Sequence, residues 1–223
     1  MARRGSIRRS RHDSERVLDI HAGHRVPGTR AHAADRGRSL DRAPWQYGCM
    51  SADPDRSLAR IEVADLLRLA ALASNAEAEL FGRNPDRSGR YAGRLLGRAL
   101  CQGAALHYVN GKNGVKDFDV WSFYAQYDDW PFPARWRGTR DFGPSKFGRW
   151  PGDPPRYSGR RVDLLGRSLP AAPGTDPADA IRRYLNAGRT DSAKYLAAKA
   201  VVLINPRNRA GEAVWPAISR PSR

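Results

Sequence analysis

Two short acidic segments set the strongest constraint on the fold of this 223-residue chain. In residues 116–120 (KDFDV), a single hydrophobic residue separates Asp117 from Asp119. Because side chains alternate between the two faces of a strand, we expect both carboxylates on the same face. Asp163, in the hydrophobic-flanked segment 161–165 (RVDLL), could join them from a neighbouring strand. Carboxylates grouped in this way can hold a divalent cation, so the pattern predicts a sheet that carries a metal site.

The composition favours one basic domain. A chain of this length can form a single substantial domain, and its formal net charge of +16 favours polyanionic partners. Arginine carries almost all of that charge, and the abundance of Ala and Gly indicates the coding bias of a GC-rich genome. The two cysteines are too few for a disulfide framework or a cysteine zinc site.

The hydropathy pattern gives no membrane segment. No apolar run is long enough to span a bilayer, and no apolar segment follows the arginine pairs near the N-terminus as a signal peptide would require. We therefore expect a soluble, cytoplasmic protein without a membrane partner.

Three regions follow from the distribution of apolar residues. Residues 1–54 are predicted to be a disordered basic tail, because residues 1–49 have no sustained hydrophobic period. This tail is either a basic arm that gathers nucleic acid or an extension upstream of a true start at Met50, and we favour the second. Residues 55–206 form the expected domain, and residues 207–223 are expected to be a loose C-terminal tail.

Two helices are predicted at the start of the domain. Leucines and other apolar residues recur through residues 58–81, which predicts one helix, and a second is expected from Asp86 toward Leu100. On that second helix, arginines recur every fourth residue and would share one face; they are Arg90, Arg94 and Arg98. Such a stripe could clasp phosphates, although more often it is a solvated face.

The rest of the domain alternates strands and helices. Strands are predicted over residues 115–124 and 161–169, and the region 126–160, rich in Pro, Trp and Arg, has no clear regular element. A helix capped by Asp176 should end near Gly188. Another helix is predicted over residues 190–204. These elements make an α/β (α+β) fold.

The residues around the acidic segments resemble a known signature. Residues 100–108 (LCQGAALHY) give a glycine and a small residue that open a short helix, residues 115–120 (VKDFDV) an acid–hydrophobic–acid strand, and Asp163 a third acid between hydrophobic residues. This order resembles the DNA polymerase beta-like nucleotidyltransferase superfamily, and in particular small prokaryotic nucleotidyltransferase-like proteins, including those found in toxin–antitoxin pairs. The resemblance spans about residues 95–169 and implies a mixed β-sheet flanked by helices.

The resemblance also implies a division of roles. Asp117 and Asp119 would hold two Mg²⁺ ions, and Asp163 would complete the second site. Gly103 and Ala104, at the start of the short helix, would let backbone amides reach the phosphates of a bound NTP. The implied reaction transfers a nucleoside monophosphate from the NTP to a hydroxyl on RNA, protein or a small molecule.

Four further residues near this signature bear on the reaction. Lys112 sits on a turn from which it could reach a phosphate, whereas Lys116 should point away from the acids and be structural. Ala104 stands where the superfamily usually has Gly or Ser, and the polar Gln102 stands where a hydrophobic residue is usual. These two departures leave open a non-catalytic copy of the fold.

Three functions remain open on the sequence. The first is the transferase, with residues 127–160 as the insert that recognises the acceptor through arginines and aromatic faces, unless its tryptophans simply cover the sheet. The second is a module of the same fold that binds nucleic acid or a protein partner without chemistry. The third is a structural protein whose acids are solvated. His107 and Cys101 are both interpreted as packing residues.

Overall fold

The computed structural model describes residues 55–128, 130–132 and 137–216. The predicted tail of residues 1–54 and the last residues, 217–223, lie outside this part of the chain. Within it, no helix is both long enough and apolar enough to cross a membrane.

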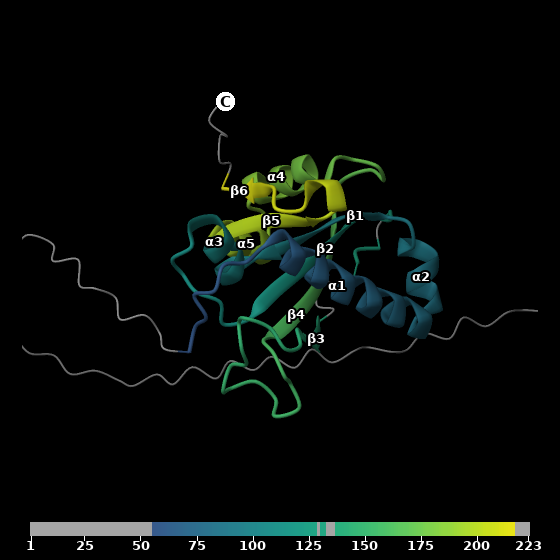
Figure 1. The fold of residues 1–223 in the computed structure, drawn as a ribbon. Helices are drawn as coiled ribbons and strands as arrows, with labels where there is room; N and C mark the ends of the chain where they lie inside the picture. The colour runs from purple at the N-terminus through teal and green to yellow at the C-terminus, as the bar shows by residue number, and fades with distance from the viewer. Residues whose placement is uncertain (1–54, 129, 133–136, 217–223) are drawn as a thin grey trace, which may run out of the picture. The chain divides into compact units, whose positions relative to one another are not determined.

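A six-stranded mixed sheet forms the centre of the domain (Figure 1). The strand order is β3-β4-β2-β1-β5-β6. The strands are β1 (Leu95–Cys101), β2 (Phe118–Ala125), β3 (Arg137–Asp141), β4 (Arg161–Leu169), β5 (Ala200–Asn205) and β6 (Ala213–Trp215). The strands β2 and β4 are parallel neighbours, and every other neighbouring pair in the sheet is antiparallel.

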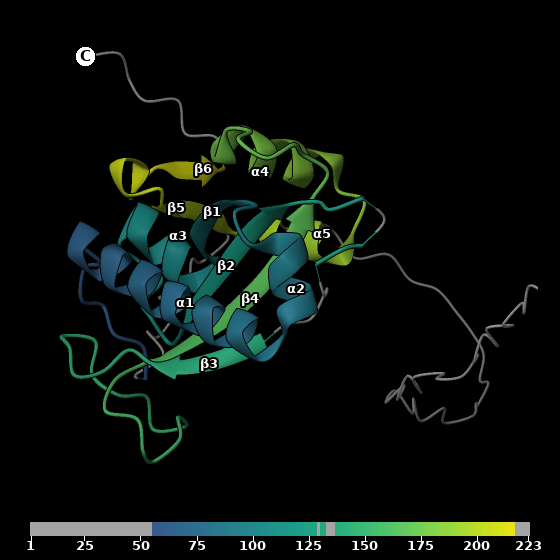
Figure 2. The same ribbon diagram turned by 90° about the vertical axis from the view of Figure 1, so that its right-hand side faces the viewer.

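Helices cover both faces of the sheet (Figure 2). The helices are α1 (Val63–Arg83), α2 (Pro85–Tyr91), α3 (Gln102–Asn110), α4 (Pro177–Ala187) and α5 (Asp191–Ala197). Alternation along β2 divides the core in two: Phe118 and Val120 pack with α1 and α3, whereas Trp121 and Phe123 pack with α4 and α5. The mixed α/β fold expected from the sequence is therefore confirmed.

The helix α1 packs through one narrow stripe. Leu66, Leu69, Ala73 and Ala76 are at most 3% exposed and recur at the spacing of three and four residues that places side chains on one helix face. The predicted helix over residues 58–81 is therefore confirmed in kind, and it begins five residues later than expected.

The predicted helix from Asp86 to Leu100 is wrong in its second half. The helix α2 ends at Tyr91, and Gly93 follows with a φ of 75°, a left-handed conformation that glycine favours. The chain then enters β1, which pairs with β2 on one side and β5 on the other. Pairing on both edges buries this stretch as a central strand and overrides its local helical pattern.

The arginine stripe expected on that helix is not formed. Arg98 lies on β1, is 3% exposed and makes an ion pair of 2.5 Å with Glu77 of α1. Glu77 also accepts a hydrogen bond from the Tyr124 hydroxyl. Burial, together with the neighbouring charge of Glu77, raises the pKa of Tyr124 above its usual range. Arg98 thus belongs to a buried polar cluster between α1 and the sheet.

Two predictions near the C-terminus also need correction. The helix expected over residues 190–204 ends at Ala197, and the apolar run that follows is β5, a strand that is buried in the sheet. Residues 207–216, expected as part of a loose tail, form a 3₁₀ helix (Arg207–Arg209) and the edge strand β6 instead. The strand β6 is held by pairing with β5, which the sequence pattern does not reveal.

The caps of α4 and α5 and the strand β4 agree closely with the sequence prediction. The Asp176 carboxylate accepts a hydrogen bond from the backbone of Asp179, and α4 is followed by Gly188 in the left-handed conformation. The Thr190 hydroxyl caps α5 in the same way. The strand predicted over residues 161–169 is β4 with the same bounds. These local signals are reliable because each depends on the chemistry of one or two residues.

Candidate active site

Two of the three acids predicted from the sequence stand side by side. Asp119 and Asp163 are partners in the register of β2 with β4, and neighbouring strands lie about 4.8 Å apart. Both belong to the face of the sheet that α4 and α5 cover, because Trp121, two residues beyond Asp119, packs in that core. Asp117 immediately precedes β2.

A pocket of about 250 Å³ brings these acids together with the start of α3. We call it the carboxylate pocket, and its lining residues are Arg56, Gln102, Gly103, Ala104, Lys116, Asp117, Asp119, Arg161, Asp163, Tyr195 and Lys199. Five of the six site residues predicted from the sequence therefore line one pocket. Lys112 is the exception.

The first turn of α3 forms one wall of the pocket. The chain leaves β1 and turns at Gln102, which has a φ of 61°, and Gly103 and Ala104 follow in the first turn. The side chain of Gln102 donates to the backbone carbonyl of Tyr195 at 2.6 Å, so the start of α3 is tied to α5. The first backbone N–H groups of a helix have no partner within it and favour anions.

Arg161 connects two of the acids. Its Nη2 lies 3.0 Å from Oδ2 of Asp117, and its Nε lies 3.2 Å from Oδ1 of Asp163. Arg161 and Asp163 are two residues apart on β4, which places their side chains on the same face. Burial alone would lower the pKa of Arg161, but the charges of Asp163 and Asp117 outweigh it and raise that pKa.

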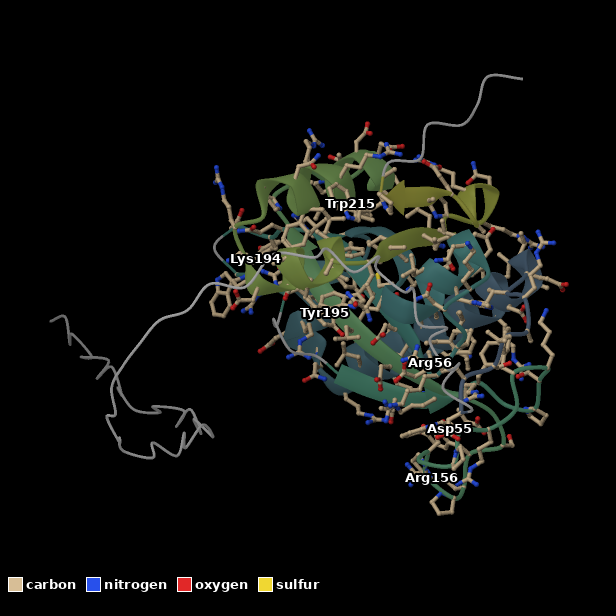
Figure 3. The ribbon with its side chains drawn as sticks, turned by 90° about the vertical axis from the view of Figure 1, so that its left-hand side faces the viewer. Asp55, Arg56, Arg156, Lys194, Tyr195 and Trp215 are labelled. Atoms are coloured by element: carbon tan, nitrogen blue, oxygen red, sulfur yellow. The ribbon has the colours of Figure 1, made fainter. Side chains whose placement is uncertain are left out.

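Other cationic side chains line the pocket as well. Arg56 comes from the segment before α1, Lys116 from the turn before β2 and Lys199 from the turn before β5. Figure 3 shows the labelled Arg56 and Tyr195 on the same side of the sheet. With Arg161, four cations surround three carboxylates, so the pocket has a net positive charge that suits a polyphosphate.

Both lysines differ from the sequence expectation. Lys116, expected to point away from the acids, lines the pocket, and its Nζ lies 4.2 Å from the centre of the Trp150 ring. It does so because it precedes β2, where strict alternation does not yet apply. Lys112 does not line the pocket; it lies in the turn after α3, where its backbone N–H donates to Asn110.

The fit of Mg²⁺ can be judged from the donors. Carboxylate oxygens are the ligands that this ion prefers, and Asp163, with a side chain 5% exposed, is the most enclosed of the paired acids. Among the described residues, however, no three His, Cys, Asp or Glu side chains are grouped closely enough to hold a metal. The guanidinium of Arg161 instead supplies the positive charge between Asp117 and Asp163. The carboxylates therefore suit Mg²⁺ by their chemistry, but Arg161 would compete with the ion for Asp117 and Asp163.

His107 and Cys101 are packing residues, as predicted. His107 is 2% exposed; its Nδ1 accepts from the backbone N–H of Gly114 at 3.0 Å, and its Nε2 lies 3.1 Å from the Ala59 carbonyl. Cys101 is fully buried, and burial, with a further contribution from the charge of Asp119, raises the pKa of its thiol. Neither residue is placed to act as a base or nucleophile in the pocket.

The sequence missed several lining residues for a physical reason. Arg161 could have been found, because alternation along its strand places it beside Asp163. Arg56, Tyr195 and Lys199 come from segments far from the acids in the chain, and only the packed fold brings them together.

Compared with family models, curated proteins and solved structures, the chain matches none of them.

Proposed function

We propose that this protein is a Mg²⁺-dependent nucleotidyltransferase, which transfers a nucleoside monophosphate from an NTP to a hydroxyl acceptor on RNA, protein or a small molecule. The observation that carries this proposal is the carboxylate pocket. There Asp117, Asp119 and Asp163 share a cavity with the first turn of α3, between four cationic side chains. Carboxylates for a metal next to backbone amides for phosphates are what such a transfer requires.

The proposed roles are those that the resemblance to nucleotidyltransferases implies. Asp117 and Asp119 would hold Mg²⁺, and Asp163 would complete the second ion's site beside the acceptor hydroxyl. Magnesium, when bound, would neutralise charge on the phosphate oxygens and on the attacking and leaving oxygens. The backbone amides of Gly103 and Ala104 would orient the triphosphate.

The reaction balances without a redox partner. The acceptor oxygen forms a bond to the α-phosphorus while the bond from that phosphorus to the oxygen bridging the β-phosphate breaks. Pyrophosphate leaves with that electron pair, and the hydroxyl would lose its proton to the Asp163 carboxylate. The side chains of Arg56, Lys116 and Lys199 are cations that favour the charged triphosphate and the departing pyrophosphate.

A second candidate is a catalytically inactive module of the same fold that binds nucleic acid or a protein partner. The ion pairs of Arg161 favour it, because they neutralise two acids that a metal would otherwise use. Ala104 favours it too, since alanine has no hydroxyl to offer a phosphate. This module would bind polyanions with strong salt dependence and without magnesium.

Nucleotide binding tests the proposal. Calorimetry with a non-hydrolysable ATP analogue that has a methylene bridge between its α- and β-phosphates should give saturable binding to the full chain in MgCl₂. Asp119→Asn removes a metal ligand while it preserves shape, so we expect affinity to fall by about tenfold or more, roughly 1.4 kcal/mol. Asp128→Asn is the matched control, because Asp128 is an exposed turn residue outside the pocket.

Two outcomes contradict the transferase. Nucleotide binding that is equal in MgCl₂ and EDTA would show that the metal has no part in it. Binding unchanged by Asp119→Asn would place the nucleotide elsewhere. Salt-sensitive binding that does not depend on magnesium, combined with no transfer from an authentic NTP, would instead identify the inactive module.

A further inference from the structure

Two adjoining pockets lie at the opposite end of β2 and β4 from the carboxylate pocket. The first, of about 360 Å³, lies between α4, the C-terminal end of β4 and the segment that follows β2. The second, of about 510 Å³, lies beside α2 and includes Trp130. Pro131 lines both. We call the pair the arginine groove, after the arginines that line it: Arg83, Arg87, Arg90, Arg167, Arg183 and Arg189.

The groove carries a strong positive charge that is exposed to solvent. Its six arginines face a single lining carboxylate, that of Asp86. Among the described residues, Arg83 is the only one of the six in an ion pair, with Glu79, and that pair is largely exposed. Arg183 and Arg189 are exposed. Among the described lining residues, arginines outnumber acids, and this excess of positive charge attracts a polyanion. Because the excess is gathered at one place on the surface, coding bias alone does not explain it.

Aromatic rings accompany the arginines. Trp130 is 57% exposed, and the Arg90 guanidinium lies 3.9 Å from the centre of its ring. In the first pocket, the Arg167 guanidinium lies 5.2 Å from the centre of the Tyr184 ring, which is only 8% exposed, so Trp130 is the ring that is open to a base. Aromatic faces beside arginines are the means by which proteins stack unpaired bases and hold the phosphates between them.

We propose that the arginine groove binds single-stranded nucleic acid. A duplex would satisfy the arginines, but its stacked bases could not enter the two pockets or reach Trp130. An acidic polypeptide would likewise use the arginines and leave the aromatic faces without a role. A single strand uses both features, with phosphates on the arginines and a base against Trp130.

The position of the groove separates binding from chemistry. Asp163 is the third residue of β4, whereas Arg167, the first residue of that strand to line the groove, is the seventh. Four residues of strand span about 13 Å at roughly 3.3 Å per residue. A strand held in the groove therefore leaves the carboxylate pocket open. If the bound strand is also the acceptor of the nucleotide, that part of the inference rests on the proposed function. The binding itself needs no metal and no NTP.

Fluorescence anisotropy tests the groove directly. The full chain is titrated into a fluorescein-labelled twelve-nucleotide single-stranded RNA, and separately the matching DNA, in EDTA and without NTP. Trp130→Ala should weaken binding by about fivefold or more, the lower bound for loss of one stacked base. The double variant Arg183→Gln, Arg189→Gln should lower the slope of log K against log salt by about 1.4, for two lost phosphate contacts.

A matched pair of substitutions controls for net charge. Arg60→Gln with Arg156→Gln removes the same charge from exposed residues that line neither the groove nor the carboxylate pocket. Equal weakening by this control pair would overturn the proposal, as would duplex RNA that binds as tightly as the single strand. Polyglutamate that binds with the same dependence on Trp130 would assign the groove to an acidic protein instead. None of these results bears on nucleotide transfer, which is absent from the assay.

Discussion

One guanidinium, that of Arg161, contacts two of the three carboxylates in the proposed active site. At the scale of single residues, this contact affects how tightly the pocket can bind a metal ion. Three acids in one small pocket repel one another, and a cation from the protein itself offsets that repulsion. The same cation must give way if Mg²⁺ binds Asp117 and Asp163. Arg161 therefore stabilises the pocket without metal at the expense of affinity for the metal.

Arg161→Gln tests this competition. Without the guanidinium, we expect Mn²⁺, used as an EPR-visible substitute for Mg²⁺, to bind about tenfold more tightly, which corresponds to roughly 1.4 kcal/mol. Arg140→Gln is the control, because Arg140 also pairs with a carboxylate, that of Glu79 on α1, but does not line the pocket. Unchanged or weaker Mn²⁺ binding in Arg161→Gln would show that the guanidinium and the metal do not compete.

At the scale of elements, one carboxylate anchors the long connection from β3 to β4. Asp141, the last residue of β3, accepts hydrogen bonds from the backbone N–H groups of Gly143, Ser158 and Gly159. Burial alone would raise the pKa of Asp141, but these hydrogen bonds outweigh it and lower that pKa. The connection leads directly into Arg161, so its anchor also fixes the start of β4.

Asp141 should make the stability of this region depend on acid pH. Since its folded-state pKa is lowered, its contribution is present above the unfolded pKa, near 3.9, and is lost as pH falls through the folded pKa. Asp141→Asn should lower the free energy of unfolding by about 1–3 kcal/mol at pH 7. The difference from the wild type should shrink below about pH 4. Urea denaturation across pH measures both effects, with Asp128→Asn as control; a difference that does not change with pH would contradict the assignment.

The same scale shows what the sequence could predict. Caps such as Asp176 and Thr190 and the strand around Asp163 were predictable, because each depends on local chemistry or alternation. For β1 and for the run after Ala197, the sequence pattern predicts helix. Both are strands buried by partners distant in sequence, and no local pattern encodes those partners.

At the scale of the whole domain, the sheet separates two charged sites. The three acids, Asp117, Asp119 and Asp163, meet at the start of β2 and β4. Their grouping could be predicted because two neighbouring strands suffice to form it. The arginine groove, at the opposite end of these strands, could not be predicted. Its arginines come from α1, α2, β4 and α4 and from the turn after α4, and only packing places them together.

Label transfer tests the central claim most directly. The full chain is incubated with each NTP labelled at the α-phosphate, MgCl₂ and a total cell extract that contains RNA, protein and small molecules, and pyrophosphate release is followed in parallel. We predict magnesium-dependent label in the RNA with an equal amount of pyrophosphate, retained in Asp128→Asn. In Asp119→Asn the rate should fall by at least about a hundredfold, roughly 2.7 kcal/mol of barrier. Label that enters protein instead would refute only the acceptor class. Transfer that is absent from the wild type, or equal in Asp119→Asn, would contradict the proposed function itself.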